Sequence, residues 1–344
     1  ETVTGQILFG LKYRHIMEDD LPIHTQFKEP NAHTIILTNY VTLEDGTGCV
    51  HTAPGHGPED YSAGVEYKLP ILSPVDQTGK FTDEAGKYKN IYIKDANDLI
   101  VDDIEDKGFL LLRDSVFHRY AHCWRCKSPL LYRASDQWFI KVEAIKDQIL
   151  KENKKVKWIP DWAGEKRFHN WIEGARDWCI SRQRFWGIPL PIWECMCGNI
   201  IVVSSTEEIK SLGGTIPEDL HKPYIDEVFI KCPKCSKKMK RVPDIADVWF
   251  DSGASTWSSL GYPQNTKKFD ELFPVDFITE GLDQTRGWFY TLMLESFIVF
   301  GRAPYNKVLM NDFVLDQFGQ KMSKSLGNVV DPNDVITKYG ADVT

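Results

Sequence analysis

Two lysines and two serine hydroxyls that share one short turn are the strongest chemical signal in this chain. They lie in the run Lys-Met-Ser-Lys-Ser, whose lysines are Lys321 and Lys324. Lysine carries a strongly hydrated, movable point charge, and charge that develops on a departing pyrophosphate is stabilised best by cations on a loop that can close over it. The run therefore predicts a polyphosphate-binding loop with Lys321 and Lys324 as candidate catalytic residues, although most lysine pairs at this spacing form only a solvated basic turn.

Acidic and amide side chains gather at a predicted strand-to-helix junction. Residues 275–279 have a strand-like pattern and residues 287–300 a helical one, and Glu280, Asp283 and Gln284 lie between them. Ligands of open α/β sheets bind at the carboxyl ends of the strands, so these side chains are expected to face a crevice. A carboxylate there can accept a hydrogen bond from a substrate ammonium or a ribose hydroxyl. The alternative is that the acidic groups complement the dipole of the helix.

An arginine pair marks a third segment, residues 177–187. Arg182 and Arg184 flank a glutamine among aromatic side chains. Such arginines can brace RNA phosphates or hold the wall of an active site by bidentate pairing, and the two interpretations have equal weight. Because they are two residues apart, they would share one face of a strand.

A loop rich in glycine and proline, residues 46–61, contains His51, His56, Glu59 and Asp60. A rigid loop with these groups can position an amine and a water molecule for hydrolysis. The pattern is weak by itself, and a metal site or an ordinary surface loop are the alternatives.

Six of the eight cysteines fall into close pairs, which suits metal ligation better than disulfides. Two pairs that a folded module brings together predict a closed, structural tetrahedral zinc site, formed by Cys195, Cys197, Cys232 and Cys235. The remaining pair, Cys123 and Cys126, is a candidate metal knuckle. Either His122 or His118 completes it, or it is a half-site that lacks its partner.

The elements that must position these residues form an α/β protein of two or three domains. Residues 1–115 show short apolar runs broken by Gly, Pro and Asp, which predicts a small β-rich domain. Within it, residues 96–107 predict a helix that Gly108 ends, before a strand at 109–112. A helix with Val142, Ile145 and Ile149 on one face is expected to precede a lysine-rich linker at 151–157.

The second half of the chain changes to an α/β pattern. We expect a connecting segment at 116–155, α/β regions at 156–192 and 244–344, and a cysteine-bearing insertion at 193–243. Residues 307–313 predict a buried strand, and Asp331 is expected to cap a last helix that Gly340 ends.

Composition limits the classes of function. The chain has 344 residues, 42% of them hydrophobic, and a net charge of −8, which argues against a general nucleic-acid coat, so any RNA contact must be local. The longest apolar segment, around 288–300, is broken by Glu295 and too short for a membrane span, and residues 1–4 do not have the basic-then-apolar pattern of a leader. A soluble, cytoplasmic monomer without membrane contact is expected.

Taken in order, these motifs resemble the isoleucyl-tRNA synthetases, a family of class I aminoacyl-tRNA synthetases. Residues 177–187, 247–253, 280–289 and 321–325 resemble the synthetic site of that family, and residues 46–61 resemble its editing pocket. In the valyl and leucyl relatives, Pro-Ala-His-Asp usually stands in place of residues 54–57.

The resemblance implies a Rossmann-type catalytic domain split by a β-rich editing domain, with zinc modules near the junctions. It also implies that the substrates are isoleucine, its tRNA and ATP with Mg²⁺. In the synthetic site Glu280 would contact the aminoacyl-adenylate, Lys324 would contact ATP, and Trp249 and Trp288 would wall the isoleucine pocket.

For editing, the resemblance implies that Asp60 holds the amino group of a mischarged valine, with His51 nearby. A second site has a physical reason, because one methylene in an apolar pocket is worth only ~1–3 kcal/mol, for which isoleucine against valine is the standard case.

Several parts of the family pattern are absent. These are the His-Ile-Gly-His motif, the threonine-rich editing strand, the anticodon-binding helical region and an early cysteine pair to complete Cys123 and Cys126. We therefore expect an internal fragment that is inactive in synthesis alone. A valyl-tRNA synthetase, a free-standing tRNA deacylase and a zinc-binding RNA chaperone are the alternatives.

Overall fold

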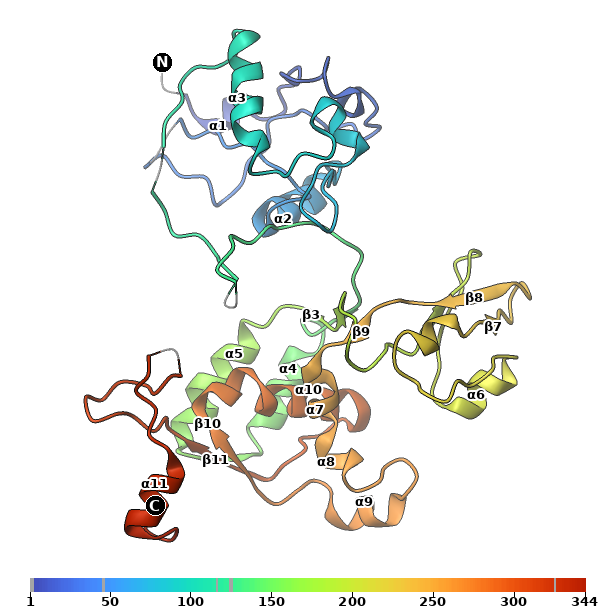
Figure 1. The fold of residues 1–344 in the computed structure, drawn as a ribbon, viewed down its shortest axis with the longest axis vertical. Coiled ribbons are helices and arrows are strands. Elements are labelled where there is room, and N and C mark those ends of the chain that lie inside the picture. Colours follow the sequence, from blue (N-terminus) through green and yellow to red (C-terminus); the bar gives the residue numbers. More distant parts are fainter. Residues whose placement is uncertain (1–2, 45–46, 116, 124–125, 325) are drawn as a thin grey trace. The chain divides into compact units, whose positions relative to one another are not determined.

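The computed structural model describes residues 3–44, 47–115, 117–123, 126–324 and 326–344 (Figure 1). The chain divides into two compact units, Glu1–Asp136 and Gln137–Thr344. Each unit has its own hydrophobic core. The domain boundaries expected from the sequence stay predictions.

The first unit is built from short helices and loops. Its small core contains Met17, Ala85 and Tyr88. The helical elements are α1 (Gly5–Leu8), η1 (Pro22–Thr25), α2 (Pro58–Tyr67), η2 (Asp83–Tyr88) and α3 (Ala96–Asp106).

The expectation of a β-rich first domain is wrong for the described residues of this unit. A strand requires a partner along its length, and the apolar runs here meet partners only at isolated bridges, such as Lys12 with Thr34 and Lys80 with Tyr92. The helix at 96–107 is confirmed as α3, and Gly108 ends it at a φ of +72°. The strand expected at 109–112 is absent, since Leu111 and Leu112 are exposed and lack strand pairing.

A three-stranded parallel sheet forms the centre of the second unit. Its order is β10 (Ile278–Gly281), β11 (Lys307–Asn311) and β2 (Lys157–Ile159). Helix α10 (Trp288–Phe300) connects β10 to β11, because parallel neighbours need a crossover. The predicted strand at 307–313 and the predicted junction between strand and helix at 275–300 are confirmed with small shifts of their bounds.

The core of this unit lies between the sheet and α10, whose residues 289–296 are all buried. A helix that is apolar on every side belongs in a core, and here Trp158 of β2 packs against Phe168, Phe289 and Tyr305. The predicted helix is present as α4 (Lys146–Asn153), which packs its fully buried Ile149 into the same core, but Val142 and Ile145 precede it. The prediction of a linker at 151–157 is wrong, because α4 continues to Asn153 and β2 begins at Lys157.

A small antiparallel sheet with its own core occupies much of the cysteine-bearing insertion. Its strands are β6 (Ile200–Val202), β5 (Ile192–Glu194), β8 (Lys238–Arg241) and β7 (Ile230–Lys231), in that order. Trp193 and Met239 are fully buried in its core. Helices α6 (Thr206–Ser211) and η4 (Tyr224–Glu227) complete this part.

The remaining elements surround the parallel sheet. Strand β1 (Phe139–Ile140) pairs with β3 (Trp178–Cys179), and β4 (Ser181–Arg182) pairs with β9 (Ile245–Ala246). The other helices are η3 (Ala163–Phe168), α5 (His169–Glu173), α7 (Val248–Gly253), α8 (Ser255–Ser258), α9 (Thr266–Leu272), η5 (Leu282–Arg286) and α11 (Pro332–Tyr339).

The last helix begins as predicted. The Asp331 side chain accepts a hydrogen bond from the backbone N–H of Asn333, and Gly340 follows the final turn of α11. In the described parts of the chain, no helix has both the length and the apolar character needed to cross a membrane.

Candidate active site and metal centre

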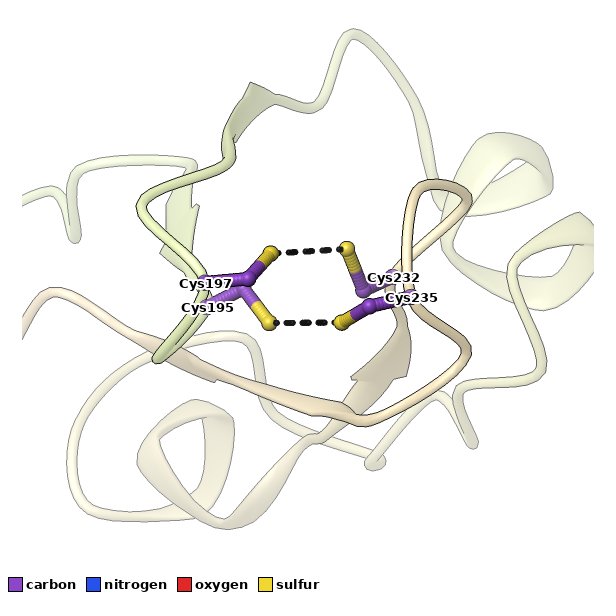
Figure 2. A group of neighbouring side chains, drawn as sticks. All are labelled: Cys195, Cys197, Cys232 and Cys235. Carbon is purple, nitrogen blue, oxygen red and sulfur yellow. Dashed lines mark hydrogen bonds between the residues drawn. The ribbon is translucent and has the colours of Figure 1, made fainter.

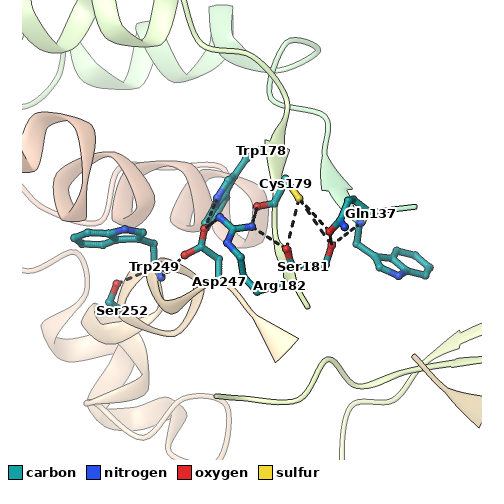
Figure 3. A network of polar contacts seen from close by, with 9 residues as sticks. Gln137, Trp178, Cys179, Ser181, Arg182, Asp247, Trp249 and Ser252 are labelled. Carbon is teal, nitrogen blue, oxygen red and sulfur yellow. Dashed lines mark hydrogen bonds and ion pairs between the residues drawn. The ribbon is translucent and has the colours of Figure 1, made fainter. Parts of the chain in front are cut away.

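A buried carboxylate fixes the start of α7, the helix that carries Trp249. Asp247 is 5% exposed and accepts a hydrogen bond from the backbone N–H of Trp249 at 3.0 Å, as the N-cap. Its other oxygen forms an ion pair with Arg182 and accepts a hydrogen bond from Nε1 of Trp178 at 3.3 Å. Figure 3 shows this network from Trp249 through Arg182 towards Ser181, whose hydroxyl donates to Gln137 at 2.6 Å.

Arg182 forms an ion pair of the kind that the second interpretation expects. Its guanidinium holds Asp247 and donates to the carbonyl oxygens of Cys179 and Ser181, both at 2.8 Å. Arg182 therefore joins strands β3 and β4 to the start of α7. Arg184 is exposed and lies beyond the end of β4, so the prediction that the two arginines share a strand face is wrong.

The run 247–253 does not by itself predict the ion pair of Asp247, although an Asp directly before a helical run is a recognisable N-cap signal. Its partner Arg182 is 65 residues away in the sequence, and no local pattern reveals such a pair.

The two candidate pocket tryptophans lie on neighbouring helices. A Cβ atom on Gly287 would lie 3.1 Å from Cη2 of Trp249, so the Trp249 ring covers the backbone at the start of α10. Trp288, the first residue of α10, donates its indole N–H to the carbonyl oxygen of Ser252 at 3.1 Å and to Oγ of Ser255 at 3.2 Å. The same Cβ atom on Gly287 would lie only 2.5 Å from Oε1 of Gln284, so glycine at this position leaves room for the Gln284 amide and the Trp249 ring.

Gln284 has a structural use at this junction. Its Oε1 accepts a hydrogen bond from the backbone N–H of Trp288 at 2.8 Å, and its Nε2 lies 3.3 Å from Oδ2 of Asp283. The amide thereby satisfies one of the free N–H groups at the start of α10.

Glu280 and Asp283 are exposed at the carboxyl end of β10, where the sequence predicts ligand-facing groups. In the sheet, Glu280 pairs in register with Met310 of β11. Glu280 and Asp283 therefore lie where β10 ends and the chain leads through η5 into α10, which begins at Trp288.

The lysine loop follows β11 and is held by its own turn. Asn328 accepts a hydrogen bond from the N–H of Ser323 at 2.8 Å and donates to Oδ2 of Asp316 at 2.8 Å. This bond from Asn328, and bonds from backbone N–H groups, lower the pKa of Asp316. Nζ of Lys321 lies 3.5 Å from the centre of the Phe313 ring, a cation–π contact. Lys321 and Lys324 are both exposed, and Ser325 lies outside the described residues.

The loop at 46–61 joins helix α2 through Asp60. Its Oδ2 accepts a hydrogen bond from the N–H of Ala53 at 3.1 Å, and its Oδ1 accepts one from the hydroxyl of Tyr40 at 3.2 Å. Helix α2 begins at Pro58, so Asp60 lies inside its first turn and ties the loop to it. His51 is exposed, and Nδ1 of His56 lies 2.9 Å from the carbonyl oxygen of Tyr132.

A histidine cluster in the first unit is not apparent from the sequence. The rings of His15 and His24 stack at 3.7 Å, and Nδ1 of His24 lies 3.2 Å from Nε2 of His33. Burial and the charges of neighbouring histidines, His51 among them, lower the pKa of both His15 and His24 to about 4. These spacings of nine residues or more match no familiar motif.

The four cysteines predicted to bind one metal come together (Figure 2). Sγ of Cys195 lies 3.4 Å from Sγ of Cys235, and Sγ of Cys197 lies 3.8 Å from Sγ of Cys232. All four sulfur atoms lie within 4.8 Å of one another. Zinc–sulfur bonds of about 2.3 Å in a tetrahedron place the sulfur atoms ~3.8 Å apart, so the cluster fits a bound metal.

Two tight turns present these sulfur atoms. Gly198 has a φ of +80° and Ser236 a φ of +60°, which is the sharp reversal that a metal knuckle needs. Burial opposes ionisation of the Cys232 thiol, but hydrogen bonds from the backbone of Cys235 and Lys234 outweigh it and lower its pKa to about 6. For Cys195, a backbone hydrogen bond at Cys197 favours ionisation, but burial and the neighbouring cysteines outweigh it and raise the pKa to about 12. The thiolate is the form that binds metal.

The contacts of the remaining pair, Cys123 and Cys126, are known only from the described residues around it. The N–H of Lys127 bonds to the carbonyl oxygen of Cys123 at 2.9 Å, and Sγ of Cys126 lies 3.2 Å from Oγ of Ser128. Over the described ranges, only the four-cysteine cluster brings three or more His, Cys, Asp or Glu ligand atoms together. Trp124 and Arg125 lie outside those ranges, and metal binding by this pair stays a prediction.

Curated relatives share about half of the chain's residues. Isoleucine–tRNA ligases of Methanothermobacter marburgensis and Archaeoglobus fulgidus are 53% and 52% identical to it, over 100% and 99% of this chain. The match covers 33% of each relative, so the chain spans about a third of their length.

Among solved structures, the Agrobacterium radiobacter LeuRS in a ternary complex with tRNA is 30% identical in sequence to this chain. The match covers 49% of this chain and 24% of the LeuRS chain. Its TM-score of 0.36 is too low to support an argument about the fold. The sequence pattern of the family described as tRNA synthetases class I (I, L, M and V) matches residues 20–344. The chain therefore belongs to the class I tRNA synthetases.

Proposed function

We propose that the polypeptide that carries these residues is an isoleucine–tRNA ligase. It activates isoleucine with ATP and Mg²⁺ and transfers it to the isoleucine tRNA, working in the cytoplasm as a monomer. The observation that carries this proposal is the packing of α7 on α10, in which the Trp249 ring covers Gly287 and the Trp288 indole bonds to Ser252, while Glu280 lies on the strand that precedes α10. Identity of about half to isoleucine–tRNA ligases supports the choice of amino acid.

In this proposal the chain supplies the second half of a Rossmann-type catalytic domain. Strands β10 and β11 with α10 between them are a parallel unit of the kind that builds such domains. Trp249 and Trp288 wall the amino-acid pocket, and Glu280, with Asp283 and Gln284 nearby, contacts the aminoacyl-adenylate. Lys321 and Lys324 stabilise the charge that develops as pyrophosphate leaves.

Isoleucine-dependent exchange between pyrophosphate and ATP tests the proposal. A polypeptide that contains this chain and has the full length of its relatives should show exchange with isoleucine far above that with valine. The 344-residue chain, which spans a third of that length, should show little. Preference for valine would favour the valyl-tRNA synthetase alternative, and absence of exchange with any amino acid would refute the proposal.

We also propose that Cys195, Cys197, Cys232 and Cys235 hold one structural zinc ion. Four thiolates leave no open position for water, so this ion would stabilise the insertion without taking part in catalysis. Elemental analysis of the 344-residue chain purified without chelator should give about one zinc per chain, and the double variant Cys232→Ser, Cys235→Ser should lose it. Zinc retained in that variant would contradict the assignment.

For the loop at 46–61 we propose a hydrolytic editing site for valine attached to the isoleucine tRNA. The carboxylate of Asp60 accepts two hydrogen bonds and has lone pairs left for a substrate ammonium. His51 is near enough to the histidine cluster for its charge to act there, and it is exposed, as a residue at a binding surface should be.

A further inference from the structure

Helix α10 buries one carboxyl group that the proposed reaction does not use. Glu295 is 6% exposed within a helix whose neighbouring residues are apolar and buried. It follows Trp288 by seven residues, so the two side chains leave the same face of α10. Helix α7 packs across this face (Figure 1).

The carboxyl group lies directly against the last residue of α7. A Cβ atom on Gly253 would lie only 2.2 Å from Oε1 of Glu295 and 2.6 Å from its Cδ. Glycine at this position therefore leaves the space that the carboxyl group fills. Within the described part of the chain, Oε1 is buried and has no hydrogen-bond partner.

An ionised carboxylate in such a place is strongly unfavourable, so the group is expected to keep its proton. Burial, with a smaller contribution from the charge of Asp251, raises the pKa of Glu295 to about 9. At neutral pH the side chain is thus an uncharged group that fills space beneath α7.

Helix α7 consequently has three supports. Asp247 caps its start, Trp288 binds the carbonyl oxygen of Ser252, and Glu295 lies under Gly253. Along α7, Trp249 lies between the cap Asp247 and the two supported residues Ser252 and Gly253. We propose that Glu295 is a positioning residue, whose buried carboxyl group supports the end of α7 and thereby sets the position of Trp249 and the affinity of the proposed pocket for its amino acid.

The positional part can be tested on the 344-residue chain without any activity. Fluorotryptophan is incorporated, and the fluorine NMR resonance of Trp249 is assigned with Trp249→Phe. Glu295→Gln, an uncharged variant of the same shape, should leave this resonance in place, whereas Glu295→Ala should shift or broaden it. If Glu295→Ala does not fold, Glu295→Asp, which shortens the side chain, serves instead.

Met293→Ala is the matched control. Met293 is fully buried in the core on another face of α10, so its truncation should lower the melting temperature without moving the Trp249 resonance. An unmoved resonance in Glu295→Ala, or an equal shift in Met293→Ala, would overturn the proposal.

The part that concerns affinity rests on the proposed function. In the active polypeptide, Glu295→Ala should raise the KM for isoleucine about tenfold with little change in kcat, whereas Glu295→Gln should keep the KM of the wild type. An unchanged KM in Glu295→Ala would refute the effect on the pocket. A wild-type protein without isoleucine-dependent exchange would instead refute the proposed function and leave the fluorine result standing.

Discussion

Helix α7 and the lysine loop are both parts of the proposed synthetic site, and the fold holds them in different ways. Buried groups fix α7, since Asp247 is almost inaccessible and α10 beneath it is buried over residues 289–296. The lysine loop is tied mainly to itself through Asn328, and Lys321 and Lys324 are exposed. We therefore expect the proposed amino-acid pocket to be formed before its ligand binds, and the proposed phosphate-binding loop to close over its ligand.

The largest expected effect separates chemistry from recognition. In the active polypeptide, Lys324→Ala should lower kcat for isoleucine activation about 100-fold or more, because its charge is needed most in the transition state. The KM for isoleucine should change little. Trp249→Ala should do the reverse, raising KM more than it lowers kcat. Pyrophosphate exchange over a range of isoleucine concentrations measures both, and equal effects on KM in the two variants would remove the distinction.

A pair of aspartates compares stability in the two regions. Asp247→Ala leaves Arg182 without its partner and removes the cap of α7, so it should lower the free energy of unfolding by about 3 kcal/mol. Asp316→Ala removes hydrogen bonds from Asn328 and from the backbone N–H groups of Phe318 and Gln320 within the lysine loop, and should lower it by only about 1 kcal/mol. Urea unfolding followed by tryptophan fluorescence reports mainly on the second unit, which holds ten of the 11 tryptophans, all but Trp124. Similar losses in both variants would contradict the comparison.

Asp60 allows a third test, in the first unit. If its charge holds the ammonium group of a misattached valine, Asp60→Ala should slow hydrolysis of valyl-tRNA by about 10- to 100-fold and leave isoleucine activation intact. Asp60→Asn is the decisive variant, because an amide can keep the contacts with Ala53 or Tyr40 but carries no charge. Normal hydrolysis in Asp60→Asn would show that Asp60 only ties the loop to α2.

The smallest effect concerns pH. His15 and His24 have a folded pKa of about 4, below their ordinary value of 6.5, so the unfolded chain takes up protons first as the pH falls. The stability of the first unit should be full above about pH 6.5 and decrease as the pH falls towards 4. The variant His24→Gln should weaken this dependence, as measured by its melting temperature from pH 7 to pH 4. An identical pH dependence in wild type and variant would refute the role of the cluster.

Local signals in the sequence predicted the second unit better than the first. Strand β11, helix α10 and the cap of α11 follow from apolar runs and from Asp before Pro, and the four cysteines meet because each pair forms its own tight turn. The prediction of a β-rich first unit is wrong because an alternating sequence pattern does not reveal whether a partner strand is present. Contacts between distant residues, such as Asp247 with Arg182 and Glu295 with Gly253, leave no local trace.

Hydrogen–deuterium exchange of the 344-residue chain tests the central comparison most directly. Peptides over residues 247–256, which include α7, should exchange slowly, since the cap Asp247 and the last residue Gly253 are buried and the contacts of Gly253 break only when α7 leaves α10. Peptides over residues 316–330, which include the lysine loop, should exchange within the shortest labelling time. Fast exchange in both regions would contradict a preformed pocket, and slow exchange in both would contradict a loop that is free to close.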